Sequence, residues 1–465
     1  MKKANTIALG ACFTFAVIIA LLAAYAGIRQ RAAAAAVYHA KWQAYAAERR
    51  AADEPVTFED IELSRPEIDP ESNGAIIIEE IAPELDRLWG AKEEHENVPF
   101  FDRNLFDDHA VDAYADAETA ALDAGRQFRE KHASLLQSLE PLRNTDSGRL
   151  SISYAFGDVN PMGFLLPDLS HWRTAARLLK LDIWLAVHNN DVERAVASTE
   201  LIAHVANTLE QEPNVICRLV QVSLDGVLVD SIQGIMSHLE PDDKQIDRLE
   251  RAVARRLDQP DLSRIFQCER AFNLRLYDGL ADGDWRWSDV AGEDDIRFSI
   301  HEIDRNKEKA AALFDQLIRA AGDHQSLIEA AEAVDAEVRP GGVPPSPDDE
   351  PFRMLRHLFP ALSRTAELHA MCIAELRSSL VCLSAVRFRR ANGRWPAGID
   401  DISDGVDDAV MIDPFNGESL RVIQADGNFI VYSVGVNRED DGGLVSPDED
   451  RRRKDAGVSV SYSGK

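Results

Sequence analysis

The stretch that decides the fold covers residues 170–210 and reads SHWRTAARLLKLDIWLAVHNNDVERAVASTELIAHVANTLE. Its apolar residues recur at the three- and four-residue spacing of one face of an α-helix. The polar triplet Asn189-Asn190-Asp191 interrupts this pattern and predicts a turn between a helix over 170–188 and a helix over 192–210. A third apolar run covers 215–239. We therefore expect antiparallel helices whose apolar stripes form a core.

Helical patterns dominate the wider range 74–338, which we interpret as one irregular helical domain. The paired helices resemble tetratricopeptide-like repeats, but the self-similarity of about 34 residues that defines such repeats does not recur. At 339–351 the helices give way to the Pro- and Gly-rich segment Arg339-Pro340-Gly341-Gly342-Val343-Pro344-Pro345-Ser346-Pro347. Because Pro and Gly break helices and central strands, this segment predicts a linker to a second domain at 352–465.

The C-terminal region combines one long helix with two short strands. The helix is expected over 351–391 and stops at Asn392-Gly393, which suits a left-handed cap. Strands over 420–423 and 429–434 flank Asp426-Gly427, a strong hairpin signal. The fold class that we predict for the whole chain is mainly α, with an N-terminal transmembrane helix, an irregular α-helical array and a small C-terminal α+β domain.

The chain begins with a long apolar segment. No charged residue occurs over 4–28, and a helix needs about 20 apolar residues to cross a membrane. We predict an uncleaved transmembrane anchor at 1–31, because the apolar run exceeds the roughly 7 to 15 residues of a cleaved signal. Basic residues flank the segment on both sides, and we favour a cytoplasmic N-terminus with the bulk of the chain outside. Residues 32–73 are expected to form an Ala-rich helical stalk and a polar linker.

The charge of the chain disfavours nucleic-acid partners. Its 51 basic and 80 acidic residues leave a net charge of -29, which repels phosphate groups. The glycine-rich loops that bind phosphate in nucleotide-binding proteins do not occur in the sequence, so we expect no nucleotide either. The cysteines show no metal-binding spacing and are expected to be separate buried thiols.

Catalytic motifs give no support to an enzyme. The sequence contains neither the His-Glu-x-x-His motif of metalloproteases nor the Gly-x-Ser-x-Gly elbow of serine hydrolases. A different feature is the pair of indoles at Trp285 and Trp287, which lie two positions apart in an acidic stretch. They are candidate ligand-binding residues that would form a stacking platform for a sugar or peptide. The alternative is buried packing, the commoner role of large aromatic side chains.

An acidic loop after the last expected strand has the ligand spacing of a calcium loop. The residues at positions 1, 3, 5, 6 and 12 of that pattern are Asn437, Glu439, Asp441, Gly442 and Asp448. Calcium prefers carboxylate and carbonyl oxygens, and the glycine permits the sharp turn that gathers them. A strand precedes the loop, which excludes an EF-hand. An isolated calcium loop and a plain solvated turn both remain open.

Four segments of the C-terminal region resemble the globular domain of the major pseudopilins of type II secretion systems. They are Asn392-Gly393-Arg394-Trp395-Pro396, Asp413-Pro414-Phe415-Asn416-Gly417, Val431-Tyr432-Ser433-Val434-Gly435 and Asp440-Asp441-Gly442-Gly443. In that family the acidic loop binds calcium, so the resemblance implies Asp440, Asp441 and Asp455 as candidate metal ligands. The N-terminus departs from the family, because Gly10 is followed five residues later by Phe15, where a prepilin peptidase site has Glu.

These features lead to three functional hypotheses. The first is a membrane-anchored extracytoplasmic protein of structural or protein-interaction type, with one membrane helix, a protein partner and a candidate calcium loop. As a whole, the chain resembles large membrane-anchored bacterial proteins that carry a pseudopilin-like tail on a helical body. The second is an envelope hydrolase or carbohydrate-binding protein with a cleft near Trp285 and Trp287. The third is an accessory component of a secretion system. A pocket with convergent titratable groups would favour the second hypothesis.

Overall fold

The computed structural model describes residues 2–101, 119–155, 168–258, 262–291, 296–340, 352–402, 405–425, 427–445 and 455–461, with only the backbone described over 2–17 and at 291. The fold is mainly helical, as expected. The longer helices are α1 (Lys2–Ala51), α3 (Gly74–Gly90), α4 (Thr119–Lys131), α6 (Ser170–His188), α7 (Val192–Asn207), α8 (Val215–His238), α9 (Asp243–Leu257), α10 (Ser263–Asp282), α12 (Ile300–Ala320), α13 (His324–Val338) and α15 (Ser363–Asn392). The shorter helices are α2 (Phe58–Ser64), α5 (Ala133–Leu139), α11 (Trp287–Ala291) and α14 (Arg353–Leu358). The strands are β1 (Arg421–Ala425), β2 (Asn428–Ser433) and β3 (Ala456–Ser461).

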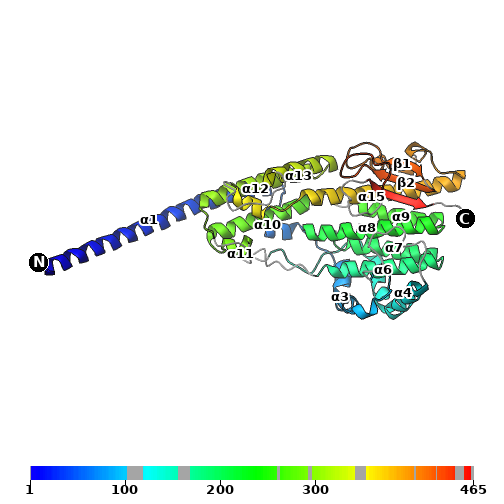
Figure 1. The fold of residues 1–465 in the computed structure, drawn as a ribbon, viewed down its shortest axis with the longest axis horizontal. Coiled ribbons are helices and arrows are strands. Elements are labelled where there is room, and N and C mark those ends of the chain that lie inside the picture. The colour runs from blue at the N-terminus through cyan, green and yellow to red at the C-terminus, as the bar shows by residue number, and fades with distance from the viewer. Residues whose placement is uncertain are drawn as a thin grey trace.

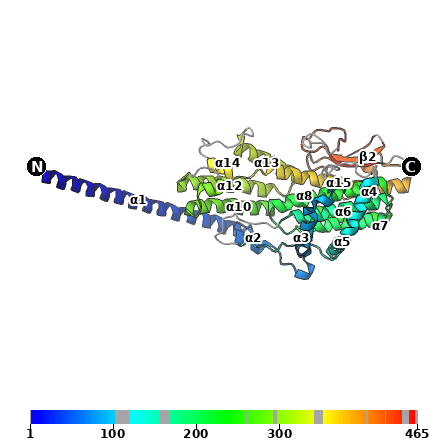
Figure 2. The same cartoon turned by 60° about the horizontal axis from the view of Figure 1, so that its bottom comes forward.

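The molecule is elongated, and α1 projects from one end as a long single helix (Figure 1). Two lobes follow along the long axis (Figures 1 and 2). The stalk-side lobe contains the C-terminal end of α1 together with α10 to α14. The distal lobe contains α3 to α9, the sheet and most of α15. Helices α8 and α15 lie side by side in the distal lobe, and the N-terminal end of α15 reaches the core of the stalk-side lobe.

The predicted helical array forms the centre of the distal lobe. Helices α6, α7 and α8 coincide closely with the three helices expected from the sequence, and they pack on one another. In the turn between α6 and α7, Asn190 adopts a left-handed φ of 55°. The side chain of Asp191 then caps α7 by accepting the N–H of Arg194 at 3.2 Å. The polar triplet therefore ends one helix and begins the next, as predicted.

The three strands form an antiparallel sheet in the order β1-β2-β3. The hairpin of β1 and β2 confirms the prediction, and Gly427 has a φ of +77° in its turn. The third strand, β3, was not expected from the sequence. It follows an acidic, Arg-rich stretch, but its side chains alternate between buried and half-buried, and Val458 is fully buried opposite Val431. The sheet packs through β2 and β3 on α15.

The helix expected over 351–391 is in fact two helices, α14 and α15. Pro360 lies in the break between them, where its ring and its missing N–H prevent a continuous helix. The predicted end of the helix is confirmed, because α15 stops at Asn392. Gly393 follows with a φ of +69°, and its N–H donates to the carbonyl oxygen of Arg389 at 2.7 Å.

Segments that carry the pseudopilin resemblance contact one another in the fold. The carboxylate of Asp413 is fully buried and accepts the hydroxyl of Ser433 at 2.7 Å and the N–H of Val434 at 2.9 Å. Trp395 stacks on Phe429 with 4.6 Å between the ring centroids and an interplanar angle of 10°. These contacts fix the loops around the sheet onto β2.

Each of the two hydrophobic cores contains residues from both 74–338 and 352–465, the ranges that the sequence predicts as separate domains. The core of the distal lobe unites α6 to α9 with α15 and with Val431 and Val458 of the sheet. The core of the stalk-side lobe unites Tyr38 and Trp42 of α1 with α10, α12, α13 and α14. Both the helical and the C-terminal part of the chain therefore contribute to each core. The linker expected at 339–351 lies almost entirely outside the described residues.

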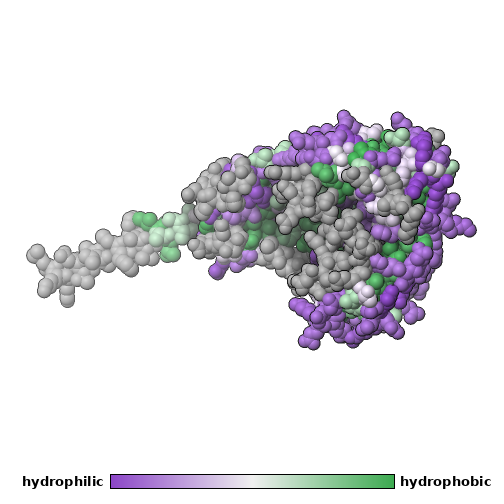
Figure 3. All heavy atoms as spheres, turned by 45° about the vertical axis from the view of Figure 1, so that its right-hand side comes forward, coloured by the Kyte–Doolittle hydropathy of each residue, from purple (hydrophilic) through white to green (hydrophobic). Residues whose placement is uncertain are grey.

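The described N-terminal part of α1 carries exposed apolar side chains. Leu21 is 65% exposed, Leu22 62% and Ile28 68%. Figure 3 shows this part of the helix in green tones, whereas the surface at the far end of the body is mainly purple. Among the described residues, one helical stretch is long and apolar enough to cross a membrane by composition, Arg353–Asn392, but 72% of its apolar window is buried. That burial is typical of a core helix.

Candidate functional site

The two tryptophans do not form the stacking platform considered from the sequence. Trp287 is only 1% exposed, and its indole packs edge-on against Phe298 with 5.1 Å between ring centroids. Trp285 lies on Gly279, where an added Cβ would approach the indole to 2.1 Å. The guanidinium of Arg275 covers the same indole at 5.0 Å from its centroid. Trp287 is therefore a buried packing residue, and Trp285 closes the C-terminal end of α10.

Asp455 holds the acidic loop in place. Its carboxylate accepts the backbone N–H groups of Gly443 at 2.7 Å, Leu444 at 3.2 Å and Asp441 at 3.3 Å. The side chain is buried, and this burial raises the pKa of the carboxyl group, although the three N–H groups oppose the shift. One carboxylate immediately before β3 thus anchors the turn of the loop.

Asp440 also accepts hydrogen bonds from within the loop and from the sheet. Its carboxylate accepts the N–H of Gly442 at 3.0 Å and the hydroxyl of Tyr432 at 3.1 Å, and it lies 3.0 Å from Nε of Arg421. The N–H of Gly442 is the largest cause that lowers the pKa of this carboxyl group. The guanidinium of Arg421 thus supplies a positive charge beside this carboxylate.

The remaining candidate ligands bond to one another. The side-chain amide of Asn437 donates to the carboxylate of Asp441 at 2.9 Å, and its oxygen accepts the N–H of Glu439 at 3.1 Å. Asp448 lies outside the described residues. Protein donors therefore reach Asp440, Asp455, Asn437 and one oxygen of Asp441, and hydrogen bonds alone account for much of the shape of the loop. Calcium binding stays a prediction.

A cavity of about 830 Å³ lies elsewhere, between α9, α15, the N-terminal end of α13 and the short helix η9 (Asp408–Met411). Its lining includes four basic or imidazole side chains, which are Arg251, His324, His369 and Arg377. Residues of α15 line one side of the cavity, and residues 405–410 of the C-terminal region line another. We regard this cavity as the candidate functional site, because it combines concave shape with convergent titratable groups.

Beneath the cavity lies a buried polar network between α8, α9 and α15. Arg256 forms two hydrogen bonds with the carboxylate of Asp225, at 2.6 and 3.1 Å, and the thiol of Cys372 donates to the same carboxylate at 3.5 Å. Arg218 is also buried, and its Nη2 lies 2.7 Å from Nδ1 of His369. Among the described residues, no carboxylate lies within salt-bridge distance of Arg218. The network therefore holds one more buried cation than it has buried carboxylates to pair with it.

Burial and the neighbouring guanidinium groups lower the pKa of both histidines. Burial, and next the guanidinium of Arg218, hold the pKa of His369 well below its ordinary range. Burial, and next the guanidinium of Arg377, lower the pKa of His324 to about 4. The two imidazoles lie 5.3 Å apart between ring centroids. Both are neutral at physiological pH, and Nδ1 of His324 has no hydrogen-bond partner among the described residues.

No local pattern in the sequence marks this site. Its members come from positions about 150 residues apart, and none of them belongs to a short motif. A usable signal exists, because Arg218 and Asp225 are charged residues within the mostly apolar buried face of α8, and His369 lies within that of α15. A charged residue within such a stripe must find a buried partner or face a cavity.

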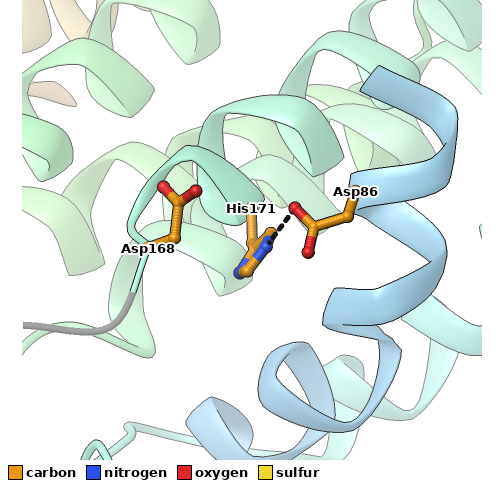
Figure 4. A group of neighbouring side chains, drawn as sticks. All are labelled: Asp86, Asp168 and His171. Carbon is orange, nitrogen blue, oxygen red and sulfur yellow. Dashed lines mark hydrogen bonds and ion pairs between the residues drawn. The ribbon is translucent and has the colours of Figure 1, made fainter. Parts of the chain in front are cut away.

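A second cluster, Asp86, Asp168 and His171, brings its ligand atoms within 4.8 Å of one another. Figure 4 shows the imidazole of His171 between the two carboxylates, with Nε2 at 2.8 Å from Asp86. Asp168 also has a structural role, since it accepts the N–H of Ser170 at the start of α6. The cluster offers three ligands, one fewer than zinc usually takes from a structural protein site.

Comparison with known proteins gives no relative. The chain matches no protein-family model, and searches of the curated proteins and of the solved structures found no similar protein.

Proposed function

We propose that the protein is a single-pass membrane protein, with α1 as the anchor and the two-lobed body on the extracytoplasmic side. The observation that carries this proposal is the exposure of Leu21, Leu22 and Ile28 on a helix that projects away from the body. A contiguous apolar surface of this kind is costly in water and favourable in the hydrocarbon of a bilayer. The uncharged run over 4–28 is long enough to cross it.

The proposed role is structural or in protein interaction, because α1 is fastened to the body as well as to the membrane. The carboxylate of Asp315 accepts the hydroxyl of Tyr45 at 3.0 Å and pairs with Arg49 at 2.7 Å and Arg270 at 2.5 Å. Trp42 donates to Asp304 at 2.9 Å. A stalk held by buried ion pairs would keep the body at a fixed distance from the bilayer, where it can dock a protein partner. The pseudopilin-like segments support a place in the cell envelope.

A catalytic role for the thiol beneath the cavity has a specific obstacle. Burial, and next the carboxylate of Asp225, raise the pKa of Cys372 well above its ordinary range. The thiolate is the nucleophile in cysteine chemistry, so a protonated buried thiol is inert. The convergent titratable groups of the cavity are of the kind that would favour the second hypothesis, but neither Trp285 nor Trp287 lines it and Cys372 does not supply a nucleophile, so we propose a binding role for the cavity.

Membrane extraction tests the anchor. The double variant Ile18→Lys, Ile19→Lys places two charges near the middle of the apolar run, and each costs about 2.5 to 3.5 kcal/mol in a membrane helix. We expect the wild-type chain to stay in the membrane pellet after an alkaline wash, and the variant to appear in the supernatant.

The matched control is Ala36→Lys, Val37→Lys, which adds the same charges at exposed positions of α1 outside the apolar run. This control should stay in the pellet. A wild-type chain that leaves the membrane in the alkaline wash would refute the anchor. Protease digestion of sealed vesicles of known orientation then decides on which side the body lies.

A further inference from the structure

The cavity between α9 and α15 is electrically asymmetric. Four acidic residues line it. Asp247 and Glu250 are neutralised by Arg387, whose guanidinium reaches Glu250 at 2.9 and 3.1 Å. Asp407 accepts the N–H of Ala409 at 2.9 Å at the start of η9, and Asp258 lies at the C-terminal end of α9. The basic side has no such compensation. Among the described residues, no carboxylate lies within salt-bridge distance of Arg377 or of Arg218 behind it. The end of the cavity formed by α15 and α13 is therefore the place where an anion is favoured.

The donors at this end are set by the network beneath. An arginine is always protonated in a protein, so Nη2 of Arg218 must donate to Nδ1 of His369. Nδ1 then carries no proton, and the neutral imidazole keeps its proton on Nε2. His369 is buried and lines the cavity, so this N–H is a fixed donor available to a ligand. Arg377 uses one N–H on the carbonyl oxygen of Ile412 at 2.6 Å, which leaves its other N–H groups for the same ligand.

The rest of the cavity is suited to an aliphatic chain. Leu257 of α9, Ile373 and Leu380 of α15, and Val406 and Val410 of the facing loop line it. A volume of about 830 Å³ lies within the range of about 300 to 1,000 Å³ that is typical of small-molecule sites. An inorganic anion would leave this apolar wall hydrated, whereas an amphipathic anion would cover it.

We propose that this cavity binds a small organic acid with an aliphatic chain, whose carboxylate is held by His369 and Arg377 and whose chain lies along the apolar wall. This assignment does not depend on the membrane anchor. His324 lies next to His369 and can donate only from the nitrogen that carries its single proton, so it completes the polar end without adding charge. The net charge of -29 makes the positive end a local exception on an acidic molecule, which favours a specific site over general anion attraction.

Calorimetric titration of the full chain in lipid nanodiscs tests the proposal. The probes are hexanoate, hexylammonium and 1-hexanol, which share a chain length and differ in the charge of the head group. Heats from empty nanodiscs are subtracted. We expect hexanoate to bind at least about tenfold more tightly than the other two, since a charge-assisted hydrogen bond supplies that difference.

Two variants locate the site. Arg377→Gln should weaken hexanoate binding by about tenfold and leave 1-hexanol unchanged, because it removes the charge and keeps the volume. Val406→Trp should abolish hexanoate binding by filling the cavity from the loop side, with circular dichroism as the check on folding. The matched control is Arg319→Gln, which removes an exposed arginine that does not line the cavity.

Each other result would overturn the proposal. Equal affinity for the three probes would show an apolar hollow without anion selectivity. Hexanoate heats no larger than those of empty nanodiscs would show no site for this class of acid. Hexanoate binding that is weakened equally by Arg377→Gln and by Arg319→Gln would show attraction by overall charge alone.

Discussion

Asp455 shows how one carboxylate can organise a loop through hydrogen bonds. Three backbone N–H groups converge on its carboxylate, and the acidic turn before β3 takes its shape from them. The spacing of acidic residues that indicates a calcium loop in the sequence also satisfies a loop closed by hydrogen bonds. Sequence spacing cannot separate the two, because it does not show whether donors or a cation face the oxygens.

Asp455→Ala should lower the free energy of unfolding by about 1 to 3 kcal/mol, because the variant leaves three N–H groups without their acceptor. The loss should be the same with excess calcium and with chelator, as measured by denaturant unfolding. The calcium prediction would instead give a stabilisation of about 2.7 kcal/mol at a hundredfold excess over the dissociation constant. That stabilisation would have to disappear in Asp440→Ala, Asp441→Ala.

The two buried histidines predict a pH dependence of stability. Unfolding restores an ordinary pKa near 6.5, whereas the folded pKa of His324 is about 4 and that of His369 is also lowered, beside Arg218 and Arg377. Between these values the unfolded chain binds protons that the folded chain does not. The contribution of these histidines to the free energy of unfolding should therefore be greatest above about pH 6.5. It should fall as pH drops toward 4, by at most about 1.4 kcal/mol per pH unit for each histidine.

Denaturant unfolding at pH 7 and pH 5.5 measures this slope. His369→Gln removes one of the two histidines and should reduce the loss of stability between the two pH values. An unchanged loss in the variant would contradict the assignment of a lowered pKa to His369.

At the scale of elements, the positions of helices could be predicted from the sequence more accurately than the breaks between them. The stripes of α6, α7 and α8 and the left-handed cap at Gly393 could be predicted, because periodicity and glycine act locally. The break at Pro360 is also local, yet the apolar pattern on both sides conceals it. Strand β3 could not be predicted from the sequence. Its six residues follow a charged stretch, and they form a strand because the edge of β2 is there to pair with them.

The packing of the C-terminal end of α1 on the stalk-side lobe depends on the ion pairs of Asp315 with Arg49 and Arg270, which no local sequence pattern predicts. Asp315→Ala should destabilise the stalk-side lobe by about 3 to 5 kcal/mol, because it leaves the fully buried Arg270 without its closest carboxylate. Thermal unfolding measures the loss. The control is Glu308→Ala, which removes an exposed partner of Lys41 and should cost less than about 1 kcal/mol. Equal effects of the two substitutions would show that the buried cluster does not fasten α1.

At the scale of the whole molecule, the sequence predicts the class of fold but not the division into cores. It indicates a helical body and a small C-terminal sheet, and both exist. It does not show that α15 packs against α8 on one side and against the sheet on another. That arrangement places His369 and Cys372 of α15 against Arg218 and Asp225 of α8 and so creates the candidate site. Contacts between residues about 150 positions apart depend on packing, and no periodicity encodes them.

The measurement that tests the proposed anchor most directly is amide hydrogen exchange of the full chain in lipid nanodiscs. We predict slow exchange over 4–28, where lipid excludes water, faster exchange over 29–33, and slow exchange again over 34–51, where α1 packs on the stalk-side lobe. Exchange over 4–28 as fast as that over 29–33 would mean that the apolar half of α1 does not lie in the bilayer, and would contradict the proposal that this helix anchors the body to a membrane.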